Sequence, residues 1–191
     1  DWRTPGVALA CGGAILTLSL GLRHGFGLFL QPMTSDLHWG RETFALALAV
    51  QNLVWGASAP FAGLLADRHG AGRVLAGSAL LYVLGLALMA YPVAPWFFVL
   101  SAGVLIGLGL SGVSFSVVQG VIGRRYPPEQ RSMALGISAA AGSFGQFALL
   151  PLTQWLLTGL GWHGALIVLA AVGLLMVPLA VGMVEKRSAR A

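Results

Sequence analysis

Charged residues are scarce in this sequence: Asp, Glu, Lys and Arg together make up 9% of its 191 residues. Soluble domains carry about 25% charged residues, so this scarcity excludes an ordinary soluble domain. Hydrophobic residues make up 57% of the chain, and its mean hydropathy is +0.83. Values this high are typical of helices that face lipid, and they predict a protein that crosses a bilayer several times.

Cysteine is nearly absent as well, because Cys11 is the only one. A single thiol allows neither an internal disulfide nor a thiolate metal cluster. Three of the four histidines, His24, His69 and His163, fall in three separate segments, which is too far apart for one metal site. The sequence also shows no nucleophile accompanied by a base and an orienting partner. We therefore expect a protein that is not an enzyme and that needs no metal or other cofactor.

The net charge of +5 does not indicate nucleic acid as a partner. The basic residues flank apolar runs and form no continuous stripe with interleaved aromatic residues, so nucleic acid is excluded. Lysine occurs once, at Lys186, and the other ten basic residues are arginines. This preference favours a GC-rich bacterial source, and it places the chain in the plasma (inner) membrane of such a cell.

Apolar runs divide the chain into six segments, separated by clusters of charged residues and proline. A helix needs roughly 20 residues to cross about 30 Å of hydrocarbon. We therefore predict an all-α fold, a bundle of six transmembrane helices. The predicted spans are residues 7–30, 43–66, 74–91, 96–122, 132–158 and 164–184. Residues 185–191 are predicted to begin a cytoplasmic linker or tail.

Basic residues are distributed unequally between the two sets of predicted loops. The set that includes both termini contains nine of them: Arg3, Arg68, Arg73, Arg124, Arg125, Arg131, Lys186, Arg187 and Arg190. The opposite set, residues 31–42, 92–95 and 159–163, contains only Arg41. Because short cytoplasmic loops accumulate Lys and Arg, we predict that both termini are cytoplasmic.

Small residues recur at a spacing of four within the predicted helices, as in Gly103 with Gly107 and Ser138 with Gly142. In lipid, small residues at this spacing let helix backbones approach closely. The glycines of 107–112 also look like part of a nucleotide-binding loop. That interpretation is rejected because no strand precedes them and no lysine follows. We expect these residues to pack helices together.

The loop between the second and third predicted helices reads Gly63-Leu-Leu-Ala-Asp67-Arg68-His-Gly70-Ala-Gly72-Arg73. A loop this short must reverse the chain between antiparallel helices, and its glycines permit the turn because glycine tolerates positive φ. Asp67 and Arg73 would bring opposite charges together at the surface. An exposed pair of this kind contributes little to stability.

This string resembles the loop signature of the major facilitator superfamily, of the form G-x-L-a-D-r-x-G-r-r. The resemblance implies a fold of two six-helix halves, of which this chain is the N-terminal one. The second half would belong to the same polypeptide or to a second copy. The resemblance also implies a gating loop in which Asp67 contacts the second half and favours the outward-open state. The gating-loop residues are Gly63, Asp67, Arg68, Gly70 and Arg73.

A narrower resemblance runs through the fifth predicted helix and beyond. Residues 131–143, 150–154 and 161–164 contain the pattern R-x-x-A-x-G-x-x-x-x-A-G-S, then P-L-x-Q, then G-W-x-G. This looks like the monocarboxylate transporter family and its bacterial relatives that exchange oxalate and formate. The resemblance implies a small organic anion as substrate, with a monocarboxylate as its class. The alternative is that these small residues mark the helix contacts of any facilitator.

Two devices that couple transport to ions in other facilitators are missing. Ser116 stands where many proton-coupled members have an arginine three residues before a Gln-Gly pair, here Gln119-Gly120. The Gly-Pro pattern of antiporters is absent, because Pro151 lies well beyond Gly145. Symport and antiport therefore both stay open, with a proton as one candidate coupling ion.

Few polar side chains lie within the predicted spans, and five of them are candidates for substrate binding: Arg23, His24, Asn52, Gln119 and Gln146. An arginine inside a span costs several kcal/mol on insertion scales. Arg23 either extends to the outer headgroups or binds an anion through its planar set of donors. In the resembling family a basic residue of the first helix serves the substrate, and Gly27-Leu-Phe29 aligns it with His24 or Arg23.

His24 has two interpretations of its own, because a histidine changes charge near neutral pH. It either couples a proton to the substrate or makes an ordinary hydrogen bond within its helix. Taken together, the sequence predicts a secondary carrier in a lipid bilayer that moves a small organic anion by alternating access. The alternative is a half-size interaction module, or a homodimerising bundle, that transports nothing by itself. A channel is disfavoured because no charged ring or filter-like loop is visible.

Overall fold

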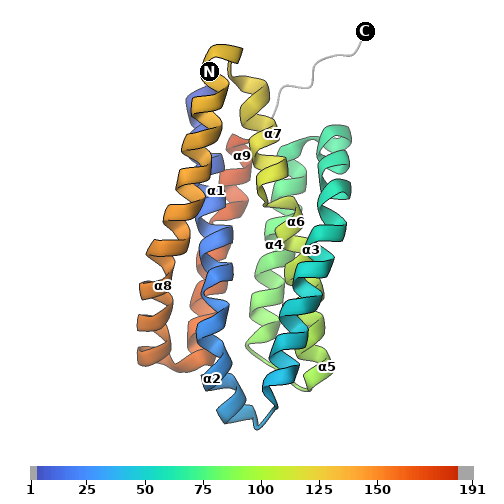
Figure 1. Cartoon of the computed structure of the whole chain (residues 1–191), viewed down its shortest axis with the longest axis vertical. Helices are drawn as coiled ribbons and strands as arrows, with labels where there is room; N and C mark the ends of the chain where they lie inside the picture. Colours follow the sequence, from blue (N-terminus) through green and yellow to red (C-terminus); the bar gives the residue numbers. More distant parts are fainter. Residues whose placement is uncertain (1–3, 185–191) are drawn as a thin grey trace.

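The computed structural model describes residues 4–184, and every regular element within that range is helical. The helices run alongside one another in a bundle (Figure 1). In chain order they are α1 (Pro5–His24), α2 (Phe26–Leu37), α3 (Arg41–His69), α4 (Ala71–Met89), α5 (Pro95–Phe98), the π-helix η1 (Val99–Leu105), α6 (Ile106–Gly112), α7 (Phe115–Arg125), α8 (Pro128–Gly173) and α9 (Met176–Gly182). The predicted all-α fold is confirmed.

Five continuous stretches in the described chain are long and apolar enough to cross a membrane, whereas six spans were predicted. They are Pro5–Leu37, Arg41–His69, Ala71–Met89, Pro95–Arg125 and Pro128–Gly182. The difference lies in the last stretch, whose 55 residues would extend about 80 Å as one straight helix. It folds back on itself instead (Figure 1), at Gly161, where φ is 70° and ψ is 174°. The predicted loop at 159–163 is thus a sharp turn between two arms of one helical stretch.

The turn at Gly161 is held by side chains that follow it. The Trp162 indole Nε1 donates to the carboxylate of Asp36 at the end of α2, at 2.8 Å. The His163 Nδ1 lies 2.7 Å from the carbonyl oxygen of Ala90, at the end of α4. These bonds join α2, α4 and α8 at one end of the bundle.

The first helical stretch is longer than predicted, because it continues through α2 to Leu37. The predicted loop at 31–42 is reduced to residues 38–40, where His38 takes a left-handed conformation with φ 53°. Met33, in the part predicted as loop, is buried. Packing of this kind outweighs the local polarity of the sequence, and the helix therefore continues.

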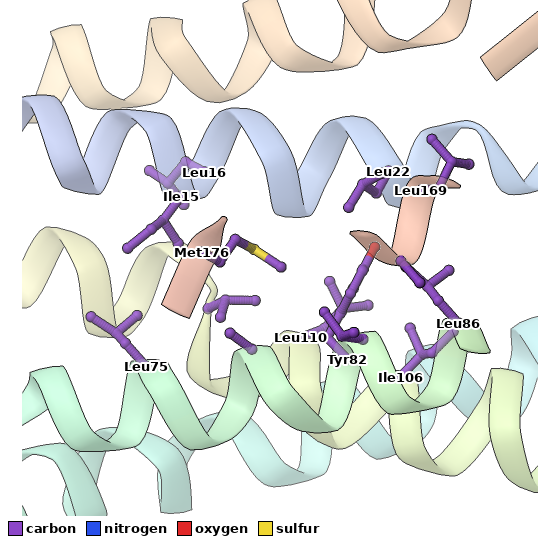
Figure 2. Packing of buried hydrophobic residues seen from close by; sticks show 14 of the residues in the cluster. Ile15, Leu16, Leu22, Leu75, Tyr82, Leu86, Ile106, Leu110, Leu169 and Met176 are labelled. Atoms are coloured by element: carbon purple, nitrogen blue, oxygen red, sulfur yellow. The ribbon is translucent and has the colours of Figure 1, made fainter. Parts of the chain in front are cut away.

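The interior lies between α1, α4, α6 and the returning arm of α8 with α9. Figure 2 shows Leu22, Tyr82 and Leu169 from three of these elements packed together. Tyr82 is fully buried, and its hydroxyl donates to the carbonyl oxygen of Ser19 at 3.1 Å. A buried hydroxyl needs such a partner, so this bond fixes α4 against α1.

Small residues bring helices into contact, as the spacing predicted. A Cβ atom at Gly103 would lie 3.1 Å from the carbonyl oxygen of Ala47, and one at Gly107 would lie 2.9 Å from that of Gln51. Both distances are tighter than ordinary van der Waals contacts, so α3 packs closely on η1 and α6, which contain these glycines. At a second crossing, a Cβ at Gly145 of α8 would overlap the backbone of Thr17 in α1.

Candidate functional site

Arg23 lies near the middle of the first helical stretch, which runs from Pro5 to Leu37. The fourteen residues from Arg23 to Leu37 correspond to about 21 Å of helix, at 1.5 Å per residue. The predicted span ended at residue 30 and therefore placed Arg23 much closer to the outer end. The added part of the helix carries the polar residues Gln31, Thr34 and Asp36, so the Arg23 side chain and the outer headgroups are separated by less than the full length of this segment.

The guanidinium of Arg23 is directed toward α3. Its Nη2 donates to the side-chain oxygen of Asn52 at 2.5 Å, and its Cζ lies 4.8 Å from the centroid of the Trp55 ring. Its Nε is buried and has no hydrogen-bond partner among residues 4–184. Arg23, Asn52 and Trp55 form a cluster, here called the α1–α3 cation cluster, in which every partner of the arginine is uncharged.

Two residues of this cluster were predicted as substrate ligands, and the structure brings them together. Trp55 was not singled out, although it follows Asn52 by three positions on the same helix. Side chains three apart lie on one helix face, so the signal was present in the spacing. The sequence alone did not show that this face of α3 turns toward Arg23.

His24 is placed differently from its neighbour Arg23. Its side chain is exposed, and its Nδ1 lies 3.0 Å from the carbonyl oxygen of Leu20, one turn earlier in α1. This local bond matches the interpretation of His24 as a histidine bonded within its helix, and its exposure leaves the other ring nitrogen open to the surface.

Gln119 lies far from the cluster. Its Nε2 is 3.4 Å from both the Ser138 hydroxyl and the Leu135 carbonyl oxygen in α8. The neighbouring Val118 meets α1 at Gly12, eleven residues before Arg23, which corresponds to about 16 Å along the helix. One site cannot contain both residues in this conformation.

Gln146 is nearer to the level of the cluster. It follows Gly145, whose backbone meets α1 at Thr17 and Gly21, and its side chain is partly exposed. The structure shows no hydrogen bond of Gln146 with Arg23 or Asn52, so its role stays a prediction.

A break in the fourth span lies close to the cluster. The helix ends at Gly112 and restarts at Phe115, and the Val113 carbonyl oxygen accepts a hydrogen bond from Ser19, at 3.3 Å. Ser19 is one turn before Arg23 on α1. No side chain caps the start of α7, and a helix N-terminus carries partial positive charge that favours an anion. The break in the fourth span thus contacts α1 about one turn away from Arg23 in the sequence of that helix.

The predicted gating loop has one confirmed feature and two corrections. Gly70 takes the positive φ (94°) expected of a turn residue. Gly72 lies inside α4 instead, where a Cβ would come within 3.0 Å of the Ala180 carbonyl oxygen, so it is needed for close packing against α9. Asp67 pairs with Arg124 of α7 at 3.4 Å and not with Arg73, because the end of α7 lies across from the end of α3.

The remaining residues of this loop are on the surface. Arg68 and Arg73 are exposed, and a Cβ atom at Gly63 would meet nothing within 4 Å. Internal packing therefore does not explain the glycine at position 63. The Asp67–Arg124 pair is exposed too, with 65% and 47% of the respective side chains accessible, and a pair this exposed adds little to stability.

Comparison with known proteins agrees with this architecture. A family model described as Major Facilitator Superfamily matches residues 9–190. Among curated proteins, mouse Monocarboxylate transporter 11 is 33% identical over 176 residues, which cover 90% of this chain and 38% of that protein. Probable anion transporter 3, chloroplastic, of Arabidopsis thaliana is 31% identical over 149 residues, which cover 76% of this chain and 28% of that protein.

Solved structures show the same fold at low sequence identity. An auto-inhibited POT family peptide transporter has a TM-score of 0.73 at 17% identity, and it is matched over 96% of this chain and 39% of its own. The POT family transporter PepTSo has a TM-score of 0.71 at 20% identity, with 98% and 39% covered. The chain spans less than two-fifths of the length of these relatives. The sequence-based resemblance to the superfamily and to monocarboxylate transporters is confirmed.

Proposed function

Because this chain belongs to the Major Facilitator Superfamily, we propose that it forms one six-helix half of a secondary carrier for a small organic anion, a monocarboxylate. Relatives named monocarboxylate transporter and anion transporter support this substrate class. A second half, from the same polypeptide or from a second copy, would complete the carrier. Substrate would then bind near the bilayer midplane between two bundles that open alternately to either side.

The observation that carries the proposal is the Arg23 guanidinium in the middle of a membrane-spanning helix. A cation at this depth costs several kcal/mol on insertion scales, and Asn52 and Trp55 do not neutralise it. A substrate carboxylate would offset the cost, because charge-assisted hydrogen bonds to guanidinium are about twice as strong as neutral ones. The uncapped start of α7 would add a second favourable interaction with the anion.

We assign His24 to the coupling of transport to pH. Its exposed ring lies one residue beyond Arg23 but projects from another face of α1, so protonation would add a positive charge at the level of the site without a direct contact with the anion. Protonated His24 would then favour binding of the substrate together with a proton. Both symport with a proton and exchange of one anion for another agree with this arrangement.

The distribution of charge in the described chain supports the proposed orientation. Arg68 and Arg73 lie at the same end of the bundle as the Asp67–Arg124 pair, and Arg41 begins α3 at the opposite end. Arg3, Lys186, Arg187 and Arg190, and the predicted linker at 185–191, lie outside the described residues. We propose that the end with Asp67 is cytoplasmic, that its loop gates the carrier, and that the membrane is the plasma membrane of a bacterium.

The proposal is tested by uptake of radiolabelled acetate, lactate and pyruvate into proteoliposomes that contain the complete protein, with and without a pH gradient. We expect saturable uptake that falls more than tenfold in Arg23→Gln. Arg41→Gln, which removes an exposed arginine at the end of the bundle, is the matched control and should keep most of the activity. If the folded protein takes up none of the three anions, the non-transporting module becomes the better account.

A further inference from the structure

The bond between Arg23 and Asn52 connects two helices that otherwise make few direct contacts, α1 and α3. Asn52 is exposed on α3, while Arg23 is half-buried. Trp55 lies under the guanidinium and limits its movement by a cation–π contact. The arginine is therefore held in one orientation by two residues of α3.

The hydrogen bond to Asn52 uses only one of the two donors on this edge of the Arg23 guanidinium. Nη2 has the amide oxygen as its acceptor, whereas the buried Nε has none. In a guanidinium these two nitrogens share one edge, and their N–H bonds point in parallel along it. A single amide oxygen engages one of these donors, but a carboxylate has two oxygens at the spacing of both.

We propose that Asn52 occupies the substrate-binding edge of Arg23 in the empty carrier, and that the substrate carboxylate displaces it. This inference rests on the proposed function and adds the position in which the anion binds. The carboxylate would accept from Nη2 and Nε together, which gives the buried Nε the partner that it lacks. Asn52 is thus a positioning residue that competes with the substrate, and not one of its ligands.

Displacement of Asn52 by the substrate would also change how α1 is held against α3. When the amide leaves Arg23, the only side-chain hydrogen bond between α1 and α3 within the described residues is broken. A carboxylate is charged and the amide is neutral, so the exchange favours the substrate once it reaches the edge. Binding would then loosen α1 from α3.

The test replaces Asn52 with residues that compete more strongly or not at all. Asn52→Asp places a carboxylate of nearly the same shape on the edge, so we expect binding and uptake to fall at least tenfold. Its thermal unfolding temperature should rise, because the new ion pair also satisfies Nε. Asn52→Ala removes the competitor, so the Kd for the bound probe should fall about three- to tenfold. Gln154→Glu, an amide-to-acid change at an exposed position on α8, is the control.

The measurements are equilibrium binding of radiolabelled lactate and acetate to the complete purified protein, uptake of the same probes, and thermal unfolding in detergent. An Asn52→Asp protein with a wild-type Kd, or with a lowered unfolding temperature, would overturn the competition. Weaker binding by Asn52→Ala would also overturn it, because Asn52 would then support the site. A different result, normal uptake by Arg23→Gln, would instead refute the proposed function itself. Unfolding temperatures test the edge geometry even if neither probe is the substrate.

Discussion

Replacement of Arg23 by lysine separates the need for charge from the need for the planar set of donors. Arg23→Lys keeps a positive charge at the same depth, so a purely electrostatic site would keep most of its affinity. An ammonium is a compact point charge that cannot present two parallel N–H groups to a carboxylate. It also loses the flat contact of the guanidinium with the Trp55 ring.

The size of the effect follows from the lost hydrogen bond. A hydrogen bond to a charged group contributes about 1.5–3 kcal/mol, and each 1.4 kcal/mol corresponds to about a tenfold change in affinity. Loss of one of two bonds should therefore raise KM for a monocarboxylate about 10- to 100-fold. The maximal rate should change less, because saturating substrate restores occupancy of the site.

The assay measures initial uptake rates against substrate concentration in proteoliposomes, with the amount of folded carrier determined for each variant. Arg41→Lys makes the same change at an exposed position and should leave KM unchanged. If Arg23→Lys keeps the wild-type KM, the bidentate geometry is wrong even if the charge matters. If the maximal rate alone falls, Arg23 acts on the conformational change and not on binding.

Four further predictions concern other parts of the molecule. His24→Gln should remove the difference between uptake rates measured at acidic and neutral external pH; an unchanged profile would place proton coupling elsewhere. Asp67→Asn should slow transport and shift spin-label distances toward the inward-open state while KM stays constant, and loss of binding would contradict a gating role. Cysteines placed at Ser132 and Gly159 in a cysteine-free background should react with an impermeant reagent from the cytoplasmic and external sides respectively; the reverse pattern would invert the topology. Tyr82→Phe should lower the free energy of unfolding by about 1 kcal/mol, measured by denaturation in detergent, and no change would show that its buried hydroxyl contributes nothing.

Part of the site could be recognised from the sequence and part could not. An arginine in an apolar run is visible without coordinates, because charge is rare in lipid-facing helices and costs free energy there. Asn52 was a candidate because it is one of the few polar side chains within the predicted spans. Trp55 was not, because the sequence of α3 does not show which face of that helix turns toward Arg23 in α1. Gln119 was included since it is polar, but its depth along the bundle separates it from Arg23.

The predicted gating loop also shows which features could be predicted from the sequence and which could not. Gly70 predicts the turn directly, because few other residues adopt its backbone angles. The partner of Asp67 is a different kind of property. Arg73 is close in sequence, yet Arg124, from a helix 57 residues away, lies opposite it. Gly72 likewise reads as a turn residue in the sequence, while its packing against α9 appears only when the helices are assembled.

The sequence by itself determined the membrane class, the all-helical architecture and the approximate position of most spans. Lipid offers no hydrogen bonds to the backbone, so an apolar run of sufficient length can only form helix there. Only the tertiary structure decided where the helices break or continue, which faces meet, and which side chains share a site. Those features depend on contacts between distant segments, such as the burial of Met33 in the core or the bond from Ser19 to Val113. Such contacts cannot be predicted from the local composition of one segment.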